Sequence, residues 1–320
     1  MKIASKLKMA LACIAFLSFA VSCDDDDNND PKPVDNTITG IAVNNSNLKI
    51  LVQALTRAEL AATLQGAGPF TVFAPTDAAF TKFLTDNKFA SVADVPKDVL
   101  TQILLNHVVS GTVKSTALTT GYVKTLAKST ASGSNTMSMY VDLTSGVKLN
   151  GGAKVTTADV MASNGVIHIV DAVINLPTIV THATANPNFT TLVATLTFNP
   201  ASGFAATLSG TASSPFTVFA PTNDAFASFL TETKFSGLAA IPPTLLETVL
   251  KYHVVTGANV LSTQLTNDQV INTFAGQNVT VKFTPTRLQD ASARNCNIIA
   301  VDVQCSNGVI HVLDKVLLPK

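Results

Sequence analysis

The chain of 320 residues contains no tryptophan and three tyrosines, and only 13% of its residues are charged. Because tryptophan and tyrosine are so scarce, the composition gives little support to an aromatic platform on which sugars could stack. The sequence also lacks a basic patch or arginine cluster, which argues against nucleic acid as a partner. Thr, Ser, Asn, Ala and Val dominate instead, and they predict a neutral, hydroxyl-rich surface that suits an extracellular module.

Three motifs typical of enzymes are also missing. The sequence has no G-x-S-x-G nucleophile elbow, no H-E-x-x-H zinc-binding helix and no G-x-x-x-x-G-K-[ST] phosphate loop. We therefore expect that the protein is not an enzyme, that it needs no cofactor or metal ion, and that it acts by binding.

The apolar run Met9–Val21 is too short for a comfortable membrane-spanning helix and, after three lysines, has the form of a secretory signal. It ends in Ala-Val-Ser before Cys23, which resembles the lipobox of bacterial lipoproteins. The resemblance implies that residues 1–22 are a lipoprotein signal peptide and that Cys23 is lipidated. The alternative is ordinary signal cleavage, with Cys23 at this place by chance.

Residues 23–36 begin with "CDDDDNNDPK" and cannot bury apolar surface, so they predict an acidic flexible tether. An acidic stretch after the lipidated cysteine resembles the surface-export signal of some Gram-negative lipoproteins. This implies an anchor in the outer membrane, facing the cell exterior. Removal of residues 1–22 leaves 18 basic and 21 acidic residues, so the mature chain carries a net charge of about −3.

Three sequence blocks occur twice, in the same order. They are "TVFAPTDAAF" and "TVFAPTNDAF" at residues 71–80 and 217–226, "LLNHVVSG" and "LKYHVVTG" at 104–111 and 250–257, and "NGVIHIVD" and "NGVIHVLD" at 164–171 and 307–314. The nearly constant offset is the size of a domain, which indicates a tandem duplication. We place the domains at residues 37–177 and 178–320.

Within each copy, helical patterns precede strand patterns. Leu48, Leu51, Leu55 and Leu64 predict a first helix, "FTVF" predicts a buried strand, and Thr76 is a suitable N-cap for the helix that follows. From His107 onward, β-branched segments alternate with Gly, Ser and Asn, as in successive strands. Helices before strands indicate an α+β domain.

The three repeated blocks resemble the fasciclin domain family. The resemblance covers residues 37–177 and 178–320, and it implies an α+β fold in each copy: a β-sandwich-like wedge with helices packed along one edge.

Four of the five histidines repeat, which raises the hypothesis of a metal site or an acid–base dyad. Asp171 follows His168 by three residues, as Asp314 follows His311, but side chains three apart on a strand point to opposite faces. We therefore interpret His168 and His311 as core residues that bond to the backbone. The fifth histidine, His182, has no counterpart, and we expect it to be solvated.

Adhesive fasciclin proteins suggest two partner-contact motifs, a Tyr-His pair and an Asp-Ile pair before the last Asn-Gly turn. Tyr252-His253 matches the first motif, with Tyr252 expected at the rim, and His107 matches it without the tyrosine. Asp159-Val160 and Asp302-Val303 match the second motif, with Val in place of Ile. In the alternative interpretation, the aliphatic residues are core and the aspartates cap turns.

Cys296 and Cys305 lie in "CNIIAVDVQC", which predicts a single strand. Nine extended steps span about 30 Å, whereas a disulfide needs Cα atoms within about 7 Å. We favour free thiols over a bridge that would require a bulge or reversal.

The sequence thus predicts a lipid-anchored, surface-exposed adhesion protein whose partner is the extracellular matrix, a cell-surface protein or a polysaccharide. The alternative is a carrier that holds a small apolar ligand, such as a pigment or lipid, in an apolar cleft. A large continuous apolar pocket would favour the carrier.

Overall fold

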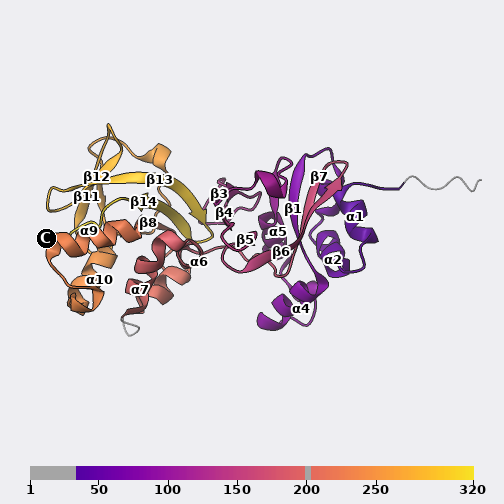
Figure 1. Ribbon diagram of the computed structural model, residues 1–320, viewed down its shortest axis with the longest axis horizontal. Coiled ribbons are helices and arrows are strands. Elements are labelled where there is room, and N and C mark those ends of the chain that lie inside the picture. Colours follow the sequence, from indigo (N-terminus) through magenta and orange to yellow (C-terminus); the bar gives the residue numbers. More distant parts are fainter. Residues whose placement is uncertain (1–33, 199–202) are drawn as a thin grey trace, which may run out of the picture. The chain divides into compact units, whose positions relative to one another are not determined.

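A computed structural model describes residues 34–198 and 203–320, in which the chain forms two copies of one order of elements (Figure 1). The expected signal peptide, the lipidation site Cys23 and the tether up to residue 33 lie outside the described residues.

The first copy is built from helices and seven strands. Its helices are α1 (Ile38–Asn44), α2 (Lys49–Arg57), α3 (Ala61–Gln65), α4 (Asp77–Asp86) and α5 (Lys97–Asn106), with short 3-10 turns η1 (Val92–Asp94) and η2 (Ser115–Ala117). Its strands are β1 (Phe70–Pro75), β2 (Val108–Ser110), β3 (Gly121–Lys124), β4 (Ser138–Asp142), β5 (Lys148–Leu149), β6 (Ala153–Ala162) and β7 (Gly165–Val170).

The second copy repeats this order. Its helices are α6 (Ile179–Ala185), α7 (Thr190–Phe198), α8 (Phe204–Ser209), α9 (Asn223–Thr233) and α10 (Pro243–Tyr252), with 3-10 turns η3 (Pro187–Phe189), η5 (Leu238–Ala240) and η6 (Ser262–Gln264). Its strands are β8 (Phe216–Pro221), β9 (Val254–Thr256), β10 (Val270–Asn272), β11 (Asn278–Lys282), β12 (Arg287–Gln289), β13 (Asn295–Cys305) and β14 (Gly308–Leu313).

Each copy has one seven-stranded sheet with the same topology. The first runs β2-β1-β7-β6-β5-β4-β3, and the second has the equivalent order β9-β8-β14-β13-β12-β11-β10. One pair in each sheet is parallel, β1 with β7 and β8 with β14, and the other pairs are antiparallel. The long strands β6 and β13 are bulged, and there the sheet bends.

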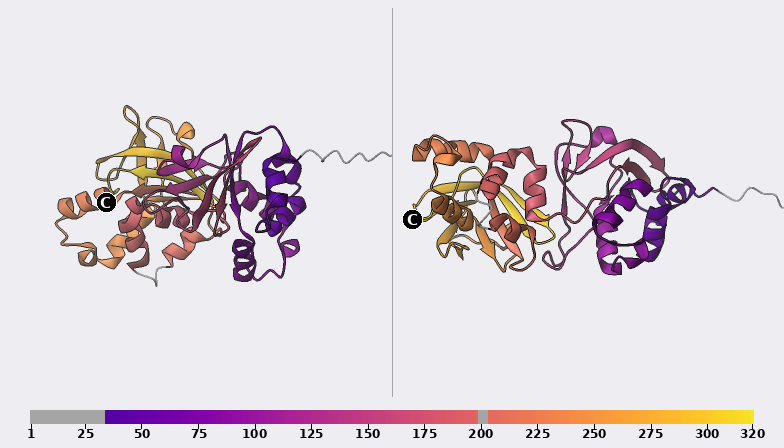
Figure 2. Two further views of the ribbon diagram at one scale, coloured as in Figure 1. Left: turned by 45° about the vertical axis from the view of Figure 1, so that its right-hand side comes forward. Right: turned by 90° about the horizontal axis from the view of Figure 1, so that it is seen from below.

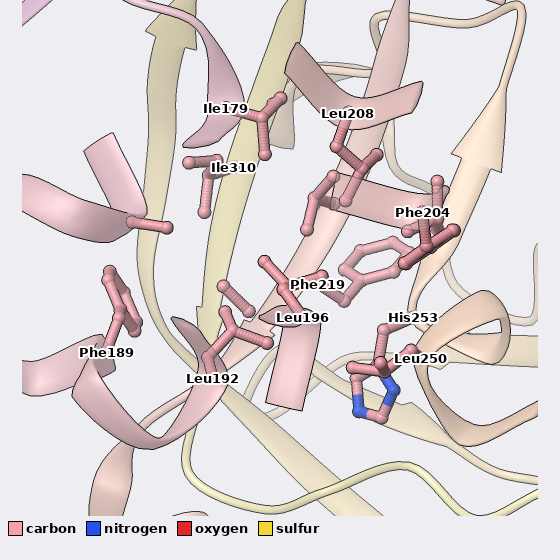
Figure 3. A pocket seen from close by; sticks show the side chains of 14 residues that line it. Ile179, Phe189, Leu192, Leu196, Phe204, Leu208, Phe219, Leu250, His253 and Ile310 are labelled. Atoms are coloured by element: carbon pink, nitrogen blue, oxygen red, sulfur yellow. The ribbon is translucent and has the colours of Figure 1, made fainter. Parts of the chain in front are cut away.

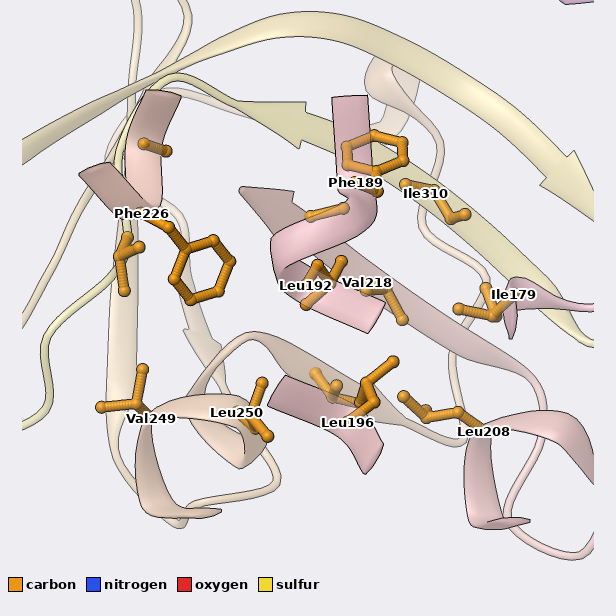
Figure 4. Packing of buried hydrophobic residues seen from close by; sticks show 14 of the residues in the cluster. Ile179, Phe189, Leu192, Leu196, Leu208, Val218, Phe226, Val249, Leu250 and Ile310 are labelled. Carbon is orange, nitrogen blue, oxygen red and sulfur yellow. The ribbon is translucent and has the colours of Figure 1, made fainter. Parts of the chain in front are cut away.

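The bend gives each copy two apolar cores, one on each side of the central strands. In the first copy, Ile167 of β7 packs with the helices, whereas Val170 packs with β4 and β5 on the other side. In the second copy the helices gather on one side of the sheet (Figure 2). There Leu192 and Phe226 point from the helices toward Val218 and Ile310 on the strands (Figure 4). Strands covered on both faces match the wedge that the fasciclin resemblance implies.

The α+β class and its duplication are therefore confirmed. Thr76 accepts a hydrogen bond from the amide of Ala79 at 3.2 Å and caps α4, as expected. The predicted single first helix is wrong in detail, because the segment forms α2 and α3 as separate helices. Glu59 stands between them with a left-handed φ of 58°, which no continuous α-helix accommodates.

Candidate functional site

The histidines His107 and His253 each join the end of a helix to the last segment of its own copy. Nδ1 of His107 donates to the carbonyl of Ile103 at 2.7 Å, and Nε2 accepts from the amide of Ile174 at 2.8 Å. His253 makes the same pair of bonds, at 2.7 Å and 2.9 Å. Both rings are buried, and burial lowers the pKa of each to about 4, so both are neutral at pH 7.

His168 and His311 lie fully buried in the central strands. Nε2 of His168 donates to the carbonyl of Val113 at 2.9 Å, Nδ1 accepts from the amide of Asp159 at 3.2 Å, and the ring stacks on Phe73. Asp171 points elsewhere and accepts from the amide of Lys154 at 2.7 Å. The structure therefore brings together no His–Asp dyad here, because successive strand positions alternate faces.

The repeated aspartates Asp159 and Asp302 sit in the bulges with left-handed φ angles of 61° and 60°. The carboxylate of Asp159 accepts from both the amide, at 2.8 Å, and the hydroxyl of Ser115. These bonds hold its pKa below the ordinary value. Asp302 makes the same pair of bonds with Ser262. Each aspartate thus fastens the 3-10 turn that precedes the later strands of its copy.

Tyr252 is buried in the second core, so its expected place at the rim is wrong. Its hydroxyl donates to the carbonyl of Asn278 at 2.7 Å and accepts from the amide of Ala291 at 2.9 Å. The counterpart Asn106 is also buried but donates to the carbonyls of Ile174 and Asn175 instead. The two copies therefore fill this position with different hydrogen-bond networks.

The seven candidate contact residues thus differ in accessibility. His107, Tyr252, His253 and Val303 are buried, whereas Asp159, Val160 and Asp302 remain partly exposed. Only these last three can meet a partner without opening the core.

His182 is fully buried, so its expected solvation is wrong. Its ring stands edge-on to Tyr122 of the first copy, with centroids 5.3 Å apart. Burial lowers its pKa to about 3, although backbone groups of Ser138 and Gln304 act in the opposite direction. Neither ring nitrogen makes a hydrogen bond of good geometry. The residue is buried because α6 packs against strand β4 of the first copy.

Nothing in the described residues assembles a metal centre, since no group of three or more His, Cys, Asp or Glu side chains there could hold an ion. Both Cys296 and Cys305 are buried free thiols on β13, as favoured from their spacing. Burial raises the pKa of Cys296 to about 12, so this thiol is unreactive at neutral pH.

Two equivalent apolar cavities lie between the helices and the sheet. The one in the second copy measures about 20 Å³ and is lined by Leu196, Phe219 and His253 among others (Figure 3). Its counterpart in the first copy measures about 10 Å³. A water molecule needs about 10–15 Å³ by this measure, so neither cavity admits a pigment or lipid in the structure described.

Comparison with known proteins identifies the repeated unit. The fasciclin domain model matches residues 46–177 and again residues 187–319. The chain belongs to the fasciclin family. A FAS1 domain pair from the insect cell adhesion molecule Fasciclin I has the same fold, with a TM-score of 0.51 at 20% identity, covering 86% of this chain and 98% of that one.

Several known proteins are similar in sequence to parts of this chain. Protein sll1483 of Synechocystis sp. is 40% identical over 142 residues, which cover 44% of this chain and 73% of that protein. Immunogenic protein MPB70 of Mycobacterium bovis is 34% identical over 147 residues, which cover 43% of this chain and 66% of that protein. Transforming growth factor-beta-induced protein ig-h3 of Sus scrofa is 29% identical over 259 residues, which cover 80% of this chain and 35% of that protein.

Asn164 and Asn307 have a role that sequence reasoning missed, having treated them only as turn formers. In the first fasciclin copy, the Asn164 side chain accepts from the amide of Ile38 at 2.9 Å. It also donates to the carbonyls of Leu64 and Gly66, both at 2.7 Å. Asn307 repeats all three bonds in the second copy. Each asparagine thus ties the start of its copy and the end of a helix to the final strand.

The glycine of each Asn-Gly pair is also needed for packing. A Cβ atom on Gly165 would lie 1.9 Å from the carbonyl oxygen of Phe70, and one on Gly308 would lie 2.2 Å from that of Phe216. Only glycine lets the parallel strands of each fasciclin copy begin side by side. The repeated Asn-Gly pair, read from the sequence as a turn, is therefore a junction of three segments.

Proposed function

We propose that this protein is a surface-exposed, lipid-anchored adhesion protein whose fasciclin domains bind a matrix component, a cell-surface protein or a polysaccharide. One observation carries the proposal: the polar side chains that repeat between the copies are engaged by the backbone of their own copy. These are His107 and His253, His168 and His311, Asp159 and Asp302, and Asn164 and Asn307. The side chains that are suited to catalysis therefore stabilise the fold instead. We infer that the protein binds its partner through its outer surface.

The comparisons support an adhesive role. The domain pair with the same fold comes from an insect cell adhesion molecule, and we extend that role to this chain. Partner contact at Asp159, Val160 and Asp302 is consistent with their partial exposure. Since the carboxylates already bond Ser115 and Ser262, we propose that they shape the contact surface. The other four candidates are buried and would support this surface without touching the partner: His107, Tyr252, His253 and Val303.

The structure offers little support for a carrier of a small apolar ligand. A carrier needs a large apolar pocket, whereas the two apolar cavities of about 20 and 10 Å³ are each close to the size of a single water molecule. An apolar ligand would have to part the helices from the sheet. Adhesion needs no such opening, so it remains the preferred function.

Membrane attachment through Cys23 is the finer part of the proposal. No helix within residues 34–198 and 203–320 is long and apolar enough to cross a bilayer. We expect Cys23→Ser to move the protein from the membrane fraction to the soluble fraction, because the acyl chains need the thiol. Cells that carry Cys23→Ser should also attach no better than cells lacking the protein to surfaces coated with matrix components, cell-surface proteins or polysaccharides. Fractionation with immunoblotting, together with a cell-attachment assay, gives both readouts.

Cys296→Ala is the matched control, since the equivalent residue of the first copy is Ala153. It should remain in the membrane fraction and support attachment. Retention of Cys23→Ser in the membrane fraction, or a mature protein mass without a lipid increment, would refute the anchor.

A further inference from the structure

A groove of about 280 Å³ lies between the two fasciclin copies. The first copy contributes Tyr122 and Tyr140, two of the three tyrosines of the chain. The second contributes Asn186 and Asn188 from the start of its helical part and Ile299 from the bulge of β13. Its volume is just below the range for small-molecule sites, which is about 300–1,000 Å³.

Direct contacts between the copies hold the walls of this groove. The Lys124 ammonium donates to the carbonyl of Asp302 at 2.7 Å, and the amide of Gln304 donates to the hydroxyl of Ser138 at 3.0 Å. The side-chain Nδ2 of Asn186 donates to the Tyr122 hydroxyl at 3.2 Å. The second copy therefore positions Tyr122.

The groove presents hydrogen-bonding groups that the protein does not use. Tyr140 is only 3% exposed but lines the groove, and its hydroxyl makes no hydrogen bond among the described residues. The Tyr122 hydroxyl accepts from Asn186 and keeps its own proton to donate. The exposed side-chain amide of Asn188 makes no hydrogen bond within the described part of the chain. A ligand could therefore meet unsatisfied donors and acceptors on both walls.

The chemistry of the lining is polar but uncharged. No Asp, Glu, Lys or Arg lines the groove, whose other polar residues are Thr120 and Thr222. The second copy also adds an apolar contact: Ile299 is 56% exposed, where the first copy has Thr156. Phenol and amide groups beside the aliphatic Ile299 suit a sugar ring, which offers hydroxyls at its edge and C–H groups on its face. A charged ligand would find no counter-charge there.

We propose that this groove binds a neutral oligosaccharide segment, so that the adhesive partner is an uncharged polysaccharide. The proposal rests on the adhesive function and names the class of ligand. The low aromatic content of the chain does not argue against it, because two of the three tyrosines line this groove and supply hydroxyl groups to it.

The test uses mature protein with Cys23→Ser, titrated by calorimetry with the hexasaccharides of the cellulose, maltose, laminarin and mannan series. We expect at least one neutral hexasaccharide to bind, with an affinity independent of salt concentration. Tyr140→Phe and Asn188→Ala should each weaken binding about three- to tenfold, through the loss of one hydrogen bond. Asn47→Ala is the matched control, because Asn47 is the exposed equivalent of Asn188 in the first copy, and it should leave binding unchanged.

Two further ligands are tested in the same way. A hyaluronan hexasaccharide represents a charged saccharide, and immobilised matrix proteins represent a protein partner. The groove proposal is overturned if no neutral hexasaccharide binds, or if Tyr140→Phe and Asn188→Ala bind as the wild type does. Binding to matrix proteins that is unaffected by these variants would overturn the groove proposal but leave the adhesive function standing. Failure of every arm would count against both.

Discussion

Asn307→Ala is expected to lower the free energy of unfolding of the second copy by about 3–5 kcal/mol, one of the largest effects of any single substitution. The side chain is fully buried and bonds the amide of Ile179 at 3.0 Å and the carbonyls of Leu208 and Gly210 at 2.8 and 2.9 Å. Alanine would leave three buried backbone groups without their side-chain partner. Urea denaturation followed by circular dichroism measures the loss, since the chain has no tryptophan for fluorescence.

Asn164→Ala is the mirror experiment, because Asn164 makes the equivalent bonds in the first copy. Hydrogen exchange read by mass spectrometry separates the two copies. Each substitution should speed exchange in its own copy and leave the other nearly unchanged. If Asn307→Ala were within about 1 kcal/mol of the wild type, the three-segment junction would not contribute what its geometry implies.

Acidification is expected to destabilise both copies between pH 6.5 and pH 4. Burial lowers the pKa of His107 and of His253 to about 4, whereas an unperturbed histidine side chain has a pKa of 6.5. Below pH 6.5 each of these two histidines therefore binds a proton in the unfolded chain but not in the folded chain, so its contribution to stability falls with pH and levels off below pH 4. A difference of this size corresponds to about 3 kcal/mol for each of the two histidines. In the second copy His182, whose pKa burial lowers to about 3, adds a further loss that continues to lower pH.

The pH dependence is measured by urea denaturation at pH values from 7.5 to about 4, with hydrogen exchange resolving the copies. His107→Gln should be less stable at pH 7 but should lose much of the pH slope of the first copy, while the second copy keeps its slope. Carboxylates such as Asp159, whose pKa is lowered, contribute in a lower range, because their stabilisation is lost only as the pH falls through and below 3.8. An unchanged slope in His107→Gln would show that His107 is not the group responsible.

Local patterns in the sequence were sufficient to predict much of the fold. The repeated blocks gave the two copies, Thr76 caps its helix, and β-branched segments such as 153–162 form strands. The alternation of side chains along β7 was enough to separate His168 from Asp171. These features depend on neighbours within a few residues, which the sequence displays directly.

The features that the sequence did not reveal depend on distant partners. Tyr252 is buried because Asn278 and Ala291 satisfy its hydroxyl, and His182 is buried because Tyr122 of the other copy covers it. Asn164 looked like an ordinary turn residue because its three bonds reach back to residues 38, 64 and 66. The groove between the copies was equally hidden, since its walls come from strands β3 and β4 and from segments that follow the first copy.

The most direct measurement of the adhesive function uses soluble, mature Cys23→Ser protein on the coated surface to which wild-type cells attach. We expect saturable, reversible retention of the purified protein on that surface. An excess of the soluble protein should also block attachment of the wild-type cells, because both compete for the same sites. If folded protein neither binds the surface nor blocks attachment, adhesion by the two fasciclin domains is contradicted.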